Sequence, residues 1–235
     1  MFYFNYNKMS VNKEKYLEIM KGLTPYNVQL VAVSKLQRVE VIQEMYDLGQ
    51  RDFGENYVQE LIEKYEMLPR DIRWHFIGHL QRNKVKYIAP FIHLIQGVDS
   101  LNLLKEINKE AHKAGRKINC LLQIHIAQEE TKFGLDEKQL DEIMDMIVNT
   151  PALLSHVKIE GLMGMASFTG DVNKVNGEMK YLKMLFDKCN KLLTTNNSQL
   201  VTLSMGMSGD YMTAIEQGSS MVRIGSLLFG ARQSK

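Results

Sequence analysis

The chain has 235 residues, of which 45% are hydrophobic and 24% charged, a composition typical of soluble globular proteins. Its 29 basic and 27 acidic residues leave a formal net charge of +2, which argues against nucleic acid or an anionic membrane as partner. The first ten residues lack the features of an export signal, and the sequence has no apolar segment long enough to span a bilayer. We therefore expect one domain over residues 1–235.

The cysteines and histidines give no sign of a metal site or a disulfide framework. Cys120 and Cys189 lack the spacing of paired ligands, and two packed thiols suit a reducing cytoplasm. No metal-ligand spacing relates the histidines at positions 75, 93, 112, 125 and 156. The sequence therefore predicts a cytoplasmic protein without a bound metal.

Strand-like and helix-like segments alternate along the chain. A helical stretch over residues 8–21 opens it, and amphipathic segments such as 39–49, 100–115 and 138–148 follow. Several of these segments end in glycine, as helix C-termini often do. Between them lie eight apolar runs, at residues 28–34, 51–54, 73–78, 92–98, 118–126, 157–165, 199–205 and 220–225.

Strict alternation of strands and helices implies parallel pairing, and eight units are the number that closes a barrel. We therefore predict an α/β fold, a single (β/α)8 TIM barrel with an extra N-terminal helix. The runs at 51–54 and 220–225 are short, so the count of eight depends most on them. An open doubly wound sheet is the alternative, although no G-x-G-x-x-G motif follows the first run.

Chemistry in such a barrel sits at the carboxyl ends of the strands, where the first apolar run ends in Ser34 and Lys35. A free lysine has a pKa of about 10.4, and partial burial lowers that pKa and favours imine formation with an aldehyde. A lysine that extends along the barrel rim into solvent is an equally good interpretation of position alone.

The seventh and eighth strand ends read SMGMSGD and RIGS, and the loops after these strands commonly bind phosphate in such barrels. Glycines let backbone N–H groups approach an anion, and serine hydroxyls donate to its oxygens. The candidate residues for this role are Ser204, Gly206, Ser208, Gly209, Gly225 and Ser226. A Gly/Ser-rich turn is often only a turn, but two at this location favour a phosphate site.

Further polar and sulfur-bearing residues lie near the same strand ends. Arg223 is placed to meet a phosphate or the ring of a bound cofactor, or to pair with a barrel carboxylate. Asn56 suits a hydrogen bond to a ring substituent, or a helix N-cap before Tyr57. His79 is a candidate acid or base, and Met165 and Met205 are candidates to pack against a planar ring, with ordinary packing as the alternative.

Seven motifs occur in order along the chain: VAVSK, FGENYVQE, WHFIGHLQRNK, KFGL, GLMGM, LSMGMSGDY and MVRIGSLLFG. Over about residues 28–232 the sequence resembles the pyridoxal phosphate homeostasis proteins, which are related to the N-terminal barrel of alanine racemases. The resemblance implies pyridoxal 5′-phosphate (PLP) bound to Lys35, phosphate contacts from SMGMS and RIGS, and no catalytic residues. It also implies cofactor-site roles for Asn56, Ser204, Gly206, Arg223, Gly225 and Ser226.

The resemblance implies a carrier that buffers or delivers PLP, with PLP-dependent apoenzymes as partners. The related racemases complete their site with a second domain and a partner subunit, whereas this sequence ends just after the eighth strand. We therefore expect a monomer with no evident turnover. A PLP-dependent amino-acid racemase or lyase is the first alternative, and a lysine aldolase that binds a sugar phosphate is the second.

Overall fold

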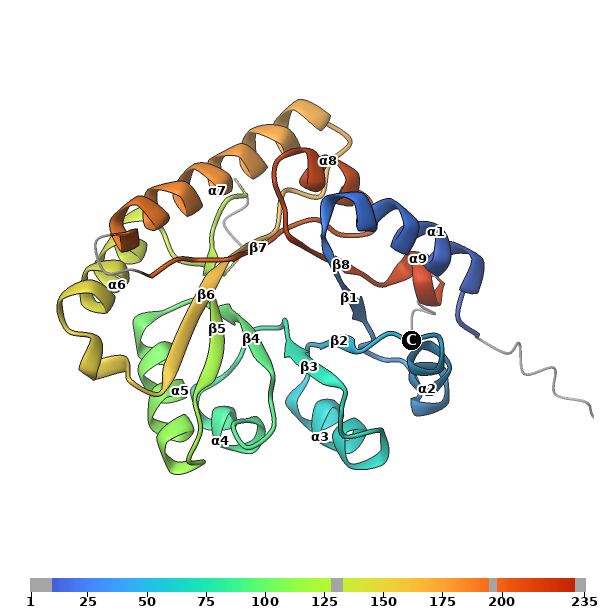
Figure 1. Cartoon of the computed structure of the whole chain (residues 1–235), viewed down its shortest axis with the longest axis horizontal. Helices are drawn as coiled ribbons and strands as arrows, with labels where there is room; N and C mark the ends of the chain where they lie inside the picture. The colour runs from blue at the N-terminus through green and yellow to red at the C-terminus, as the bar shows by residue number, and fades with distance from the viewer. Residues whose placement is uncertain (1–9, 128–132, 195–197, 231–235) are drawn as a thin grey trace, which may run out of the picture.

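Eight parallel strands close into a barrel in the computed structural model (Figure 1), which describes residues 10–127, 133–194 and 198–230. Each strand pairs with the next along the chain, and the eighth pairs with the first. The strands are β1 Gln29–Val33, β2 Asp52–Glu55, β3 Arg73–Phe76, β4 Leu94–Val98, β5 Ile118–Ile124, β6 Val157–Gly164, β7 Thr202–Ser204 and β8 Met221–Ile224. This closed order confirms the predicted (β/α)8 barrel.

Helices surround the barrel on its outer side (Figure 1). They are α1 Lys13–Leu23, α2 Val39–Asp47, α3 Val58–Met67, α4 Val85–Ile88, α5 Leu101–Lys113, α6 Glu137–Asn149, α7 Val172–Leu193, α8 Tyr211–Glu216 and α9 Ser226–Phe229, with short 3₁₀ turns at Thr24–Tyr26, Arg82–Lys84 and Pro151–Leu154. α1 confirms the extra N-terminal helix, although the predicted start at residues 8 and 9 lies outside the described residues. None of the helices in the described ranges is long and apolar enough to cross a membrane.

Two helices end where the sequence places glycines. Gly49 follows α2 with φ 103°, and Gly115 follows α5 with φ 64°. Residues with a Cβ rarely adopt these backbone conformations, so glycine ends each helix at little conformational cost.

The core is divided by the sheet into an outer and an inner part. The outer part packs the barrel wall against the helices, and it holds the large buried side chains Trp74, Phe53 and Phe76. A separate cluster of Val31, Leu94, Leu121, Met163 and Met221 fills the barrel interior, with Met165 packed against it.

Alternation along β8 decides which of its side chains face the barrel axis. Met221 belongs to the inner cluster, while Val222 and Ile224 belong to the outer core. Successive side chains of a strand point to opposite faces, so Arg223 also points into the barrel. A cation therefore lies on the barrel axis near the carboxyl ends of the strands.

Candidate functional site

A cavity of about 710 Å³ opens at the carboxyl ends of the strands. Eight of the candidate residues line it: Lys35, Asn56, Met165, Ser208, Gly209, Arg223, Gly225 and Ser226. Apolar side chains such as Val33, Ile77 and Leu227 complete the walls. An amine, an amide, a guanidinium and two hydroxyls therefore share one largely apolar cavity, as expected of a small-molecule site.

Lys35 lies in a tight turn directly after β1. The N–H of Gln37 donates to the Ser34 carbonyl oxygen at 3.0 Å, and Leu36 has φ 63°. A leucine in this left-handed region is strained by roughly 1 kcal/mol, so contacts from outside the turn must hold it. One such contact comes from Glu60, whose Oε1 accepts from the Leu36 N–H at 2.6 Å.

A buried ion pair between Lys64 and Glu55 holds the turn that contains Lys35. Lys64 Nζ lies 2.8 Å from Glu55 Oε1 and 2.6 Å from Glu60 Oε1, and it donates to the Ser34 carbonyl oxygen at 2.8 Å. The Ser34 hydroxyl also donates to Glu55 Oε1, at 2.6 Å. The peptide groups on both sides of Lys35 are thereby fixed by α3 and β2, in an arrangement that we call the Lys35 clamp: Ser34, Glu55, Glu60 and Lys64.

Burial raises the pKa of Glu55 to about 7, although Lys64 and the Ser34 hydroxyl oppose the shift. Glu55 is 0% exposed, and its Oε2 has no hydrogen-bond partner within the described ranges. The sequence alone did not predict that Glu55, Glu60 and Lys64 hold the turn of Lys35. Glu60 and Lys64 stand four residues apart, and this spacing is the signal that places both on one helix face.

Asn56 offers a buried hydrogen-bond acceptor to the cavity. Its Oδ1 is buried without a partner in the described part of the chain, although a buried amide oxygen normally has one. The alternative role as a helix N-cap is wrong, since Tyr57 occupies the N-cap position of α3 and no side chain caps the helix there. An unpaired acceptor that lines a cavity indicates a ligand that donates to it.

Arg223 is almost fully buried beside the cavity. Its Nη1 donates to Ser204 Oγ at 2.5 Å, and its Nη2 donates to the Gly164 carbonyl oxygen at 2.9 Å. Burial lowers the pKa of Arg223 to about 10, while Asp210 acts in the opposite direction. The guanidinium stays charged at neutral pH. Its partners are neutral oxygens, and not the barrel carboxylate that the sequence analysis gave as an alternative partner.

Three predicted site residues do not line the cavity. Ser204 is fully buried beneath Arg223 and donates its hydroxyl hydrogen to Gln96 Oε1 at 2.8 Å, so it contacts Arg223 rather than the cavity. Met205 packs in the outer core, because neighbours along a strand face opposite sides.

Gly206 has a structural role instead. Its φ is 96°, its carbonyl oxygen accepts from the Arg223 N–H at 3.0 Å, and a Cβ there would lie 2.6 Å from the Cβ of Ala214. The glycine thus lets helix α8 approach the barrel and does not itself face the cavity.

Ser208 and Gly225 join the last two strand-end loops. The Gly225 N–H donates to Ser208 Oγ at 3.3 Å, across the turn that leads to Ser226. A Cβ at Gly225 would meet the Val33 carbonyl oxygen at 3.2 Å, so a larger residue would crowd the mouth. The two Gly/Ser turns therefore meet at one edge of the cavity, as the sequence predicts.

His79 lies apart from Lys35. Its Nδ1 is 2.8 Å from Asp99 Oδ2, and its ring stacks on Phe133 with centroids 4.2 Å apart. It lines a second, polar cavity with Arg82 and Ser100. His79 is therefore not positioned to act as acid or base at Lys35.

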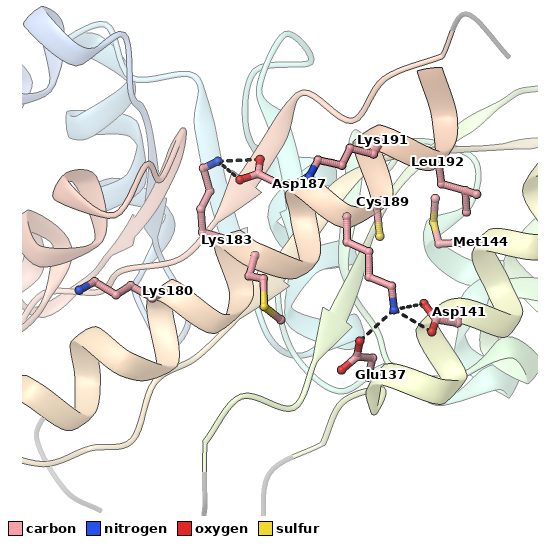
Figure 2. Close-up of a pocket in the computed structure, with 11 residues that line it drawn as sticks. Glu137, Asp141, Met144, Lys180, Lys183, Asp187, Cys189, Lys191 and Leu192 are labelled. Carbon is pink, nitrogen blue, oxygen red and sulfur yellow. Dashed lines mark hydrogen bonds and ion pairs between the residues drawn. The ribbon is translucent and has the colours of Figure 1, made fainter. Parts of the chain in front are cut away.

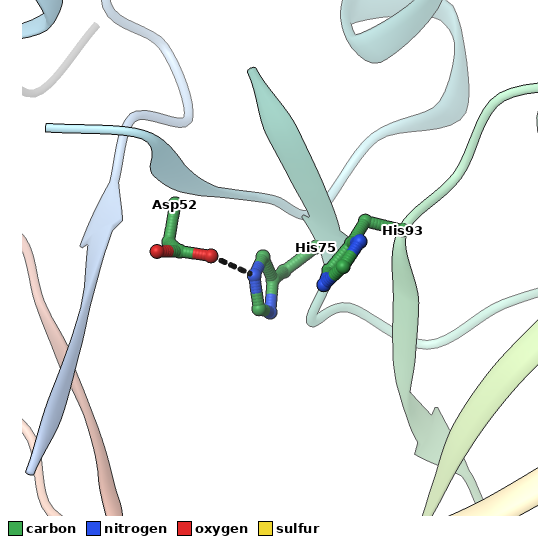
Figure 3. Close-up of side chains that lie close together, drawn as sticks. All are labelled: Asp52, His75 and His93. Carbon is green, nitrogen blue, oxygen red and sulfur yellow. Dashed lines mark hydrogen bonds and ion pairs between the residues drawn. The ribbon is translucent and has the colours of Figure 1, made fainter. Parts of the chain in front are cut away.

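A cluster at the opposite end of the barrel was also missed. Asp52, His75 and His93 bring ligand-type atoms within 4.8 Å of one another (Figure 3). Sequence spacing concealed this, since the three residues come from or precede different strands. Figure 3 shows the Asp52 carboxylate directed at His75, and the Nε2 to Oδ1 distance is 3.0 Å.

A larger hollow of about 960 Å³ lies between α6 and α7 on the outside of the barrel (Figure 2). Lys188 bridges Glu137 and Asp141 there, and Lys183 pairs with Asp187. These five side chains satisfy one another at the surface, so none of them is left to hold a cofactor.

The sequence matches the family model described as alanine racemase, N-terminal domain, over residues 13–233. A protein of Aquifex aeolicus is 40% identical over 206 residues, covering 87% of each chain, and is named pyridoxal phosphate homeostasis protein. A human protein with the same name is 38% identical over 222 residues, covering 90% of this chain and 79% of its own.

A solved structure shares the fold over most of its length. PipY of Synechococcus elongatus, determined with PLP bound, superposes with a TM-score of 0.82 at 32% identity and covers 92% of this chain and 99% of its own. The fold thus occurs in a relative whose structure was determined with PLP bound.

Proposed function

Because the chain belongs to the pyridoxal phosphate homeostasis proteins of the alanine racemase N-terminal domain family, we propose that it binds PLP at the barrel mouth. Lys35 holds the cofactor as a Schiff base, and the whole chain, residues 1–235, acts as one PLP-binding domain in intracellular PLP homeostasis. The observation that carries the proposal is the convergence of Lys35, Asn56 and Arg223 on one cavity.

The cavity residues fit the chemical groups of PLP. The buried Oδ1 of Asn56 lacks a donor, and a ring hydroxyl supplies one. Lys35 and Arg223 bring positive charge to the cavity, which favours an anionic ligand. Val33, Ile77 and Met165 offer the apolar walls that a planar ring requires.

The phosphate end of the cofactor belongs to the loops after β7 and β8. Ser208 and Ser226 line the cavity there with Gly209 and Gly225. Hydroxyl groups and glycine backbone donate to phosphate oxygens without steric hindrance. Ser204 and Gly206 support this site indirectly, through Arg223.

Lys35 acts as a reversible tether. Its neutral amine adds to the aldehyde carbon and one water molecule leaves, and the addition of water reverses the reaction and frees the amine. The clamp fixes the backbone of Lys35, so the amine is presented from a rigid turn.

A carrier role is supported over racemisation by the residues around the cavity. A two-base racemase needs a proton-transfer group on each face of its substrate. Among the described residues that line the cavity, Asp210 is the one with a carboxylate that could act as a base. Its Oδ1 already accepts a hydrogen bond from the Met207 N–H at 2.6 Å. The relatives are likewise named for homeostasis.

The proposal includes a cytoplasmic monomer whose partners are PLP-dependent apoenzymes, without nucleic acid or membrane. Transfer is tested by mixing PLP-loaded protein with an apoenzyme and following the gain of activity. Loaded wild type should restore activity, whereas Lys35→Ala, after desalting, should carry too little PLP to do so. Racemised or cleaved amino acid in the same mixture without the apoenzyme would contradict the carrier role.

A further inference from the structure

A continuous chain of hydrogen bonds runs through the barrel from the cavity to the opposite end. Arg223 Nη1 contacts Ser204 Oγ at 2.5 Å, and Ser204 Oγ contacts Gln96 Oε1 at 2.8 Å. Gln96 Nε2 lies 3.0 Å from His75 Nδ1, and His75 Nε2 lies 3.0 Å from Asp52 Oδ1. We call these five residues, from five different strands, the axial chain.

All five members are shielded from water. Ser204, Gln96 and His75 are 0% exposed, and Arg223 and Asp52 are 4% and 5% exposed. Buried polar groups are costly unless each is paired, and barrels of this type usually fill their interior with apolar layers. A polar chain at this position therefore calls for a reason beyond packing.

The donor and acceptor roles follow from Arg223 onward. Arginine only donates, so the Ser204 oxygen accepts and its own hydrogen goes to Gln96 Oε1. The amide nitrogen of Gln96 then faces His75 and donates to Nδ1. His75 consequently carries its hydrogen on Nε2 and donates it to Asp52. Every bond points in the same direction, from the cation to the carboxylate.

The far end of the chain is closed by Arg73, which donates through Nε and Nη2 to both oxygens of Asp52. These bonds and His75 hold the pKa of Asp52 well below its usual range, although burial acts in the opposite direction. Both nitrogens of His75 and both oxygens of Asp52 thus have protein partners. The cluster in Figure 3 is better explained as the anchored end of the axial chain than as a metal site.

We propose that Ser204, Gln96 and His75 are positioning residues that fix the guanidinium of Arg223 against the cofactor. The inference rests on the proposed function, because it assumes that PLP occupies the cavity. Two hydrogen bonds use two of the five N–H groups of the Arg223 guanidinium and hold its plane between β6 and β7. The cavity-facing side of the guanidinium is thereby presented in one orientation.

The first test uses the protein without cofactor. Nitrogen-15 NMR of the imidazole of His75 should report a hydrogen on Nε2 and none on Nδ1 in the wild type. In Gln96→Glu the carboxylate replaces the donor that faces Nδ1, so a hydrogen should appear on Nδ1. A wild-type His75 that carries its hydrogen on Nδ1 would contradict the proposed order of donors and acceptors in the axial chain.

The second test uses the PLP-loaded protein and Gln96→Met, which keeps the side-chain length and removes the amide. We expect a shifted visible absorption band of bound PLP and a roughly tenfold weaker affinity, as for loss of a charge-linked hydrogen bond. Gln50→Met is the matched control, since Gln50 is also buried but bonds to the backbone carbonyls of Leu30 and Asp52. It should lose stability without moving the band.

The outcomes separate this inference from the proposed function. If wild type binds PLP on Lys35 but Gln96→Met leaves both band and affinity unchanged, the inference is wrong and the function stands. If wild type shows no band and Lys35 stays unmodified, the function fails. Should Gln96→Met not fold, Gln96→Glu gives the same two readouts, and an unchanged band and affinity there would likewise overturn the proposal.

Discussion

Lys64 Nζ donates to the backbone carbonyl oxygen of Ser34 at 2.8 Å, and so an ammonium group on α3 holds the residue that precedes Lys35. Lys64 is itself buried and is neutralised by Glu55 and Glu60. The amine that we assign to the cofactor is thus presented by a buried electrostatic network rather than by a flexible loop.

Removal of Lys64 should destabilise the protein strongly at alkaline pH. Lys64→Met leaves Glu55 buried without its cation, which costs about 3–5 kcal/mol when the carboxylate is charged. Urea unfolding at pH 8 and at pH 5.5 measures this loss, which should be smaller at pH 5.5, where Glu55 is protonated. The double variant Lys64→Met/Glu55→Gln removes both charges and should recover much of the stability. No recovery would mean that Lys64 acts through packing alone.

Glu55 should make stability fall as the pH rises from 4.5 to 7. The unfolded chain releases the Glu55 proton near the ordinary pKa of 4.5, whereas the folded protein holds it until about pH 7. In this interval the folded state binds more protons, so the free energy of unfolding decreases with pH. The difference in unfolding free energy between wild type and Glu55→Gln isolates this contribution. A difference that is constant over the interval would show that Glu55 has an ordinary pKa.

Asn56 should matter more for binding than for folding. Its Oδ1 has no partner among the described residues, so Asn56→Ala removes an unsatisfied acceptor and should cost little stability. Affinity for PLP, followed by absorbance titration, should weaken roughly tenfold because the ligand loses its acceptor. A large fall in melting temperature with unchanged affinity would contradict this assignment.

Gly206 should tolerate no side chain, in contrast to its neighbour Gly209. Gly206→Ala combines φ 96° with a contact of 2.6 Å to the Cβ of Ala214, and we expect a loss of about 2 kcal/mol or more. Gly209→Ala meets nothing within 4 Å and serves as the control. Thermal unfolding of both variants decides the matter, and equal melting temperatures would refute the role given to Gly206.

The fold could be predicted from the sequence because the same strand and helix pattern recurs along the chain. Eight apolar runs that alternate with amphipathic segments specify parallel strands, and the observed closure confirms the count. The boundaries were less accurate: the run at 199–205 is reduced to β7 Thr202–Ser204. Apolar content shows that a segment is buried, but hydrogen bonding to the neighbouring strands decides where the strand ends.

The site was only partly predictable. Strand-end position picked out Lys35, Asn56 and Arg223, which line the cavity, but it could not separate residues that face the cavity from those one step away on the strand. Ser204 and Met205 show this, since one lies beneath Arg223 and the other points to the outer core.

The axial chain, and most contacts of the Lys35 clamp, could not be predicted from the sequence for a different reason. Their members, such as Gln96 and Lys64, are ordinary residues whose importance comes from contacts between distant segments. A single sequence carries no record of such pairings.

The central claim is tested most directly by borohydride reduction of the PLP-loaded protein followed by peptide mass mapping. Reduction makes a Schiff base permanent, so the modified lysine identifies the attachment point. The account predicts one pyridoxyl adduct on Lys35, absent from Lys35→Ala. A PLP-loaded protein whose Lys35 remains unmodified, or whose adduct falls on another lysine, would contradict it.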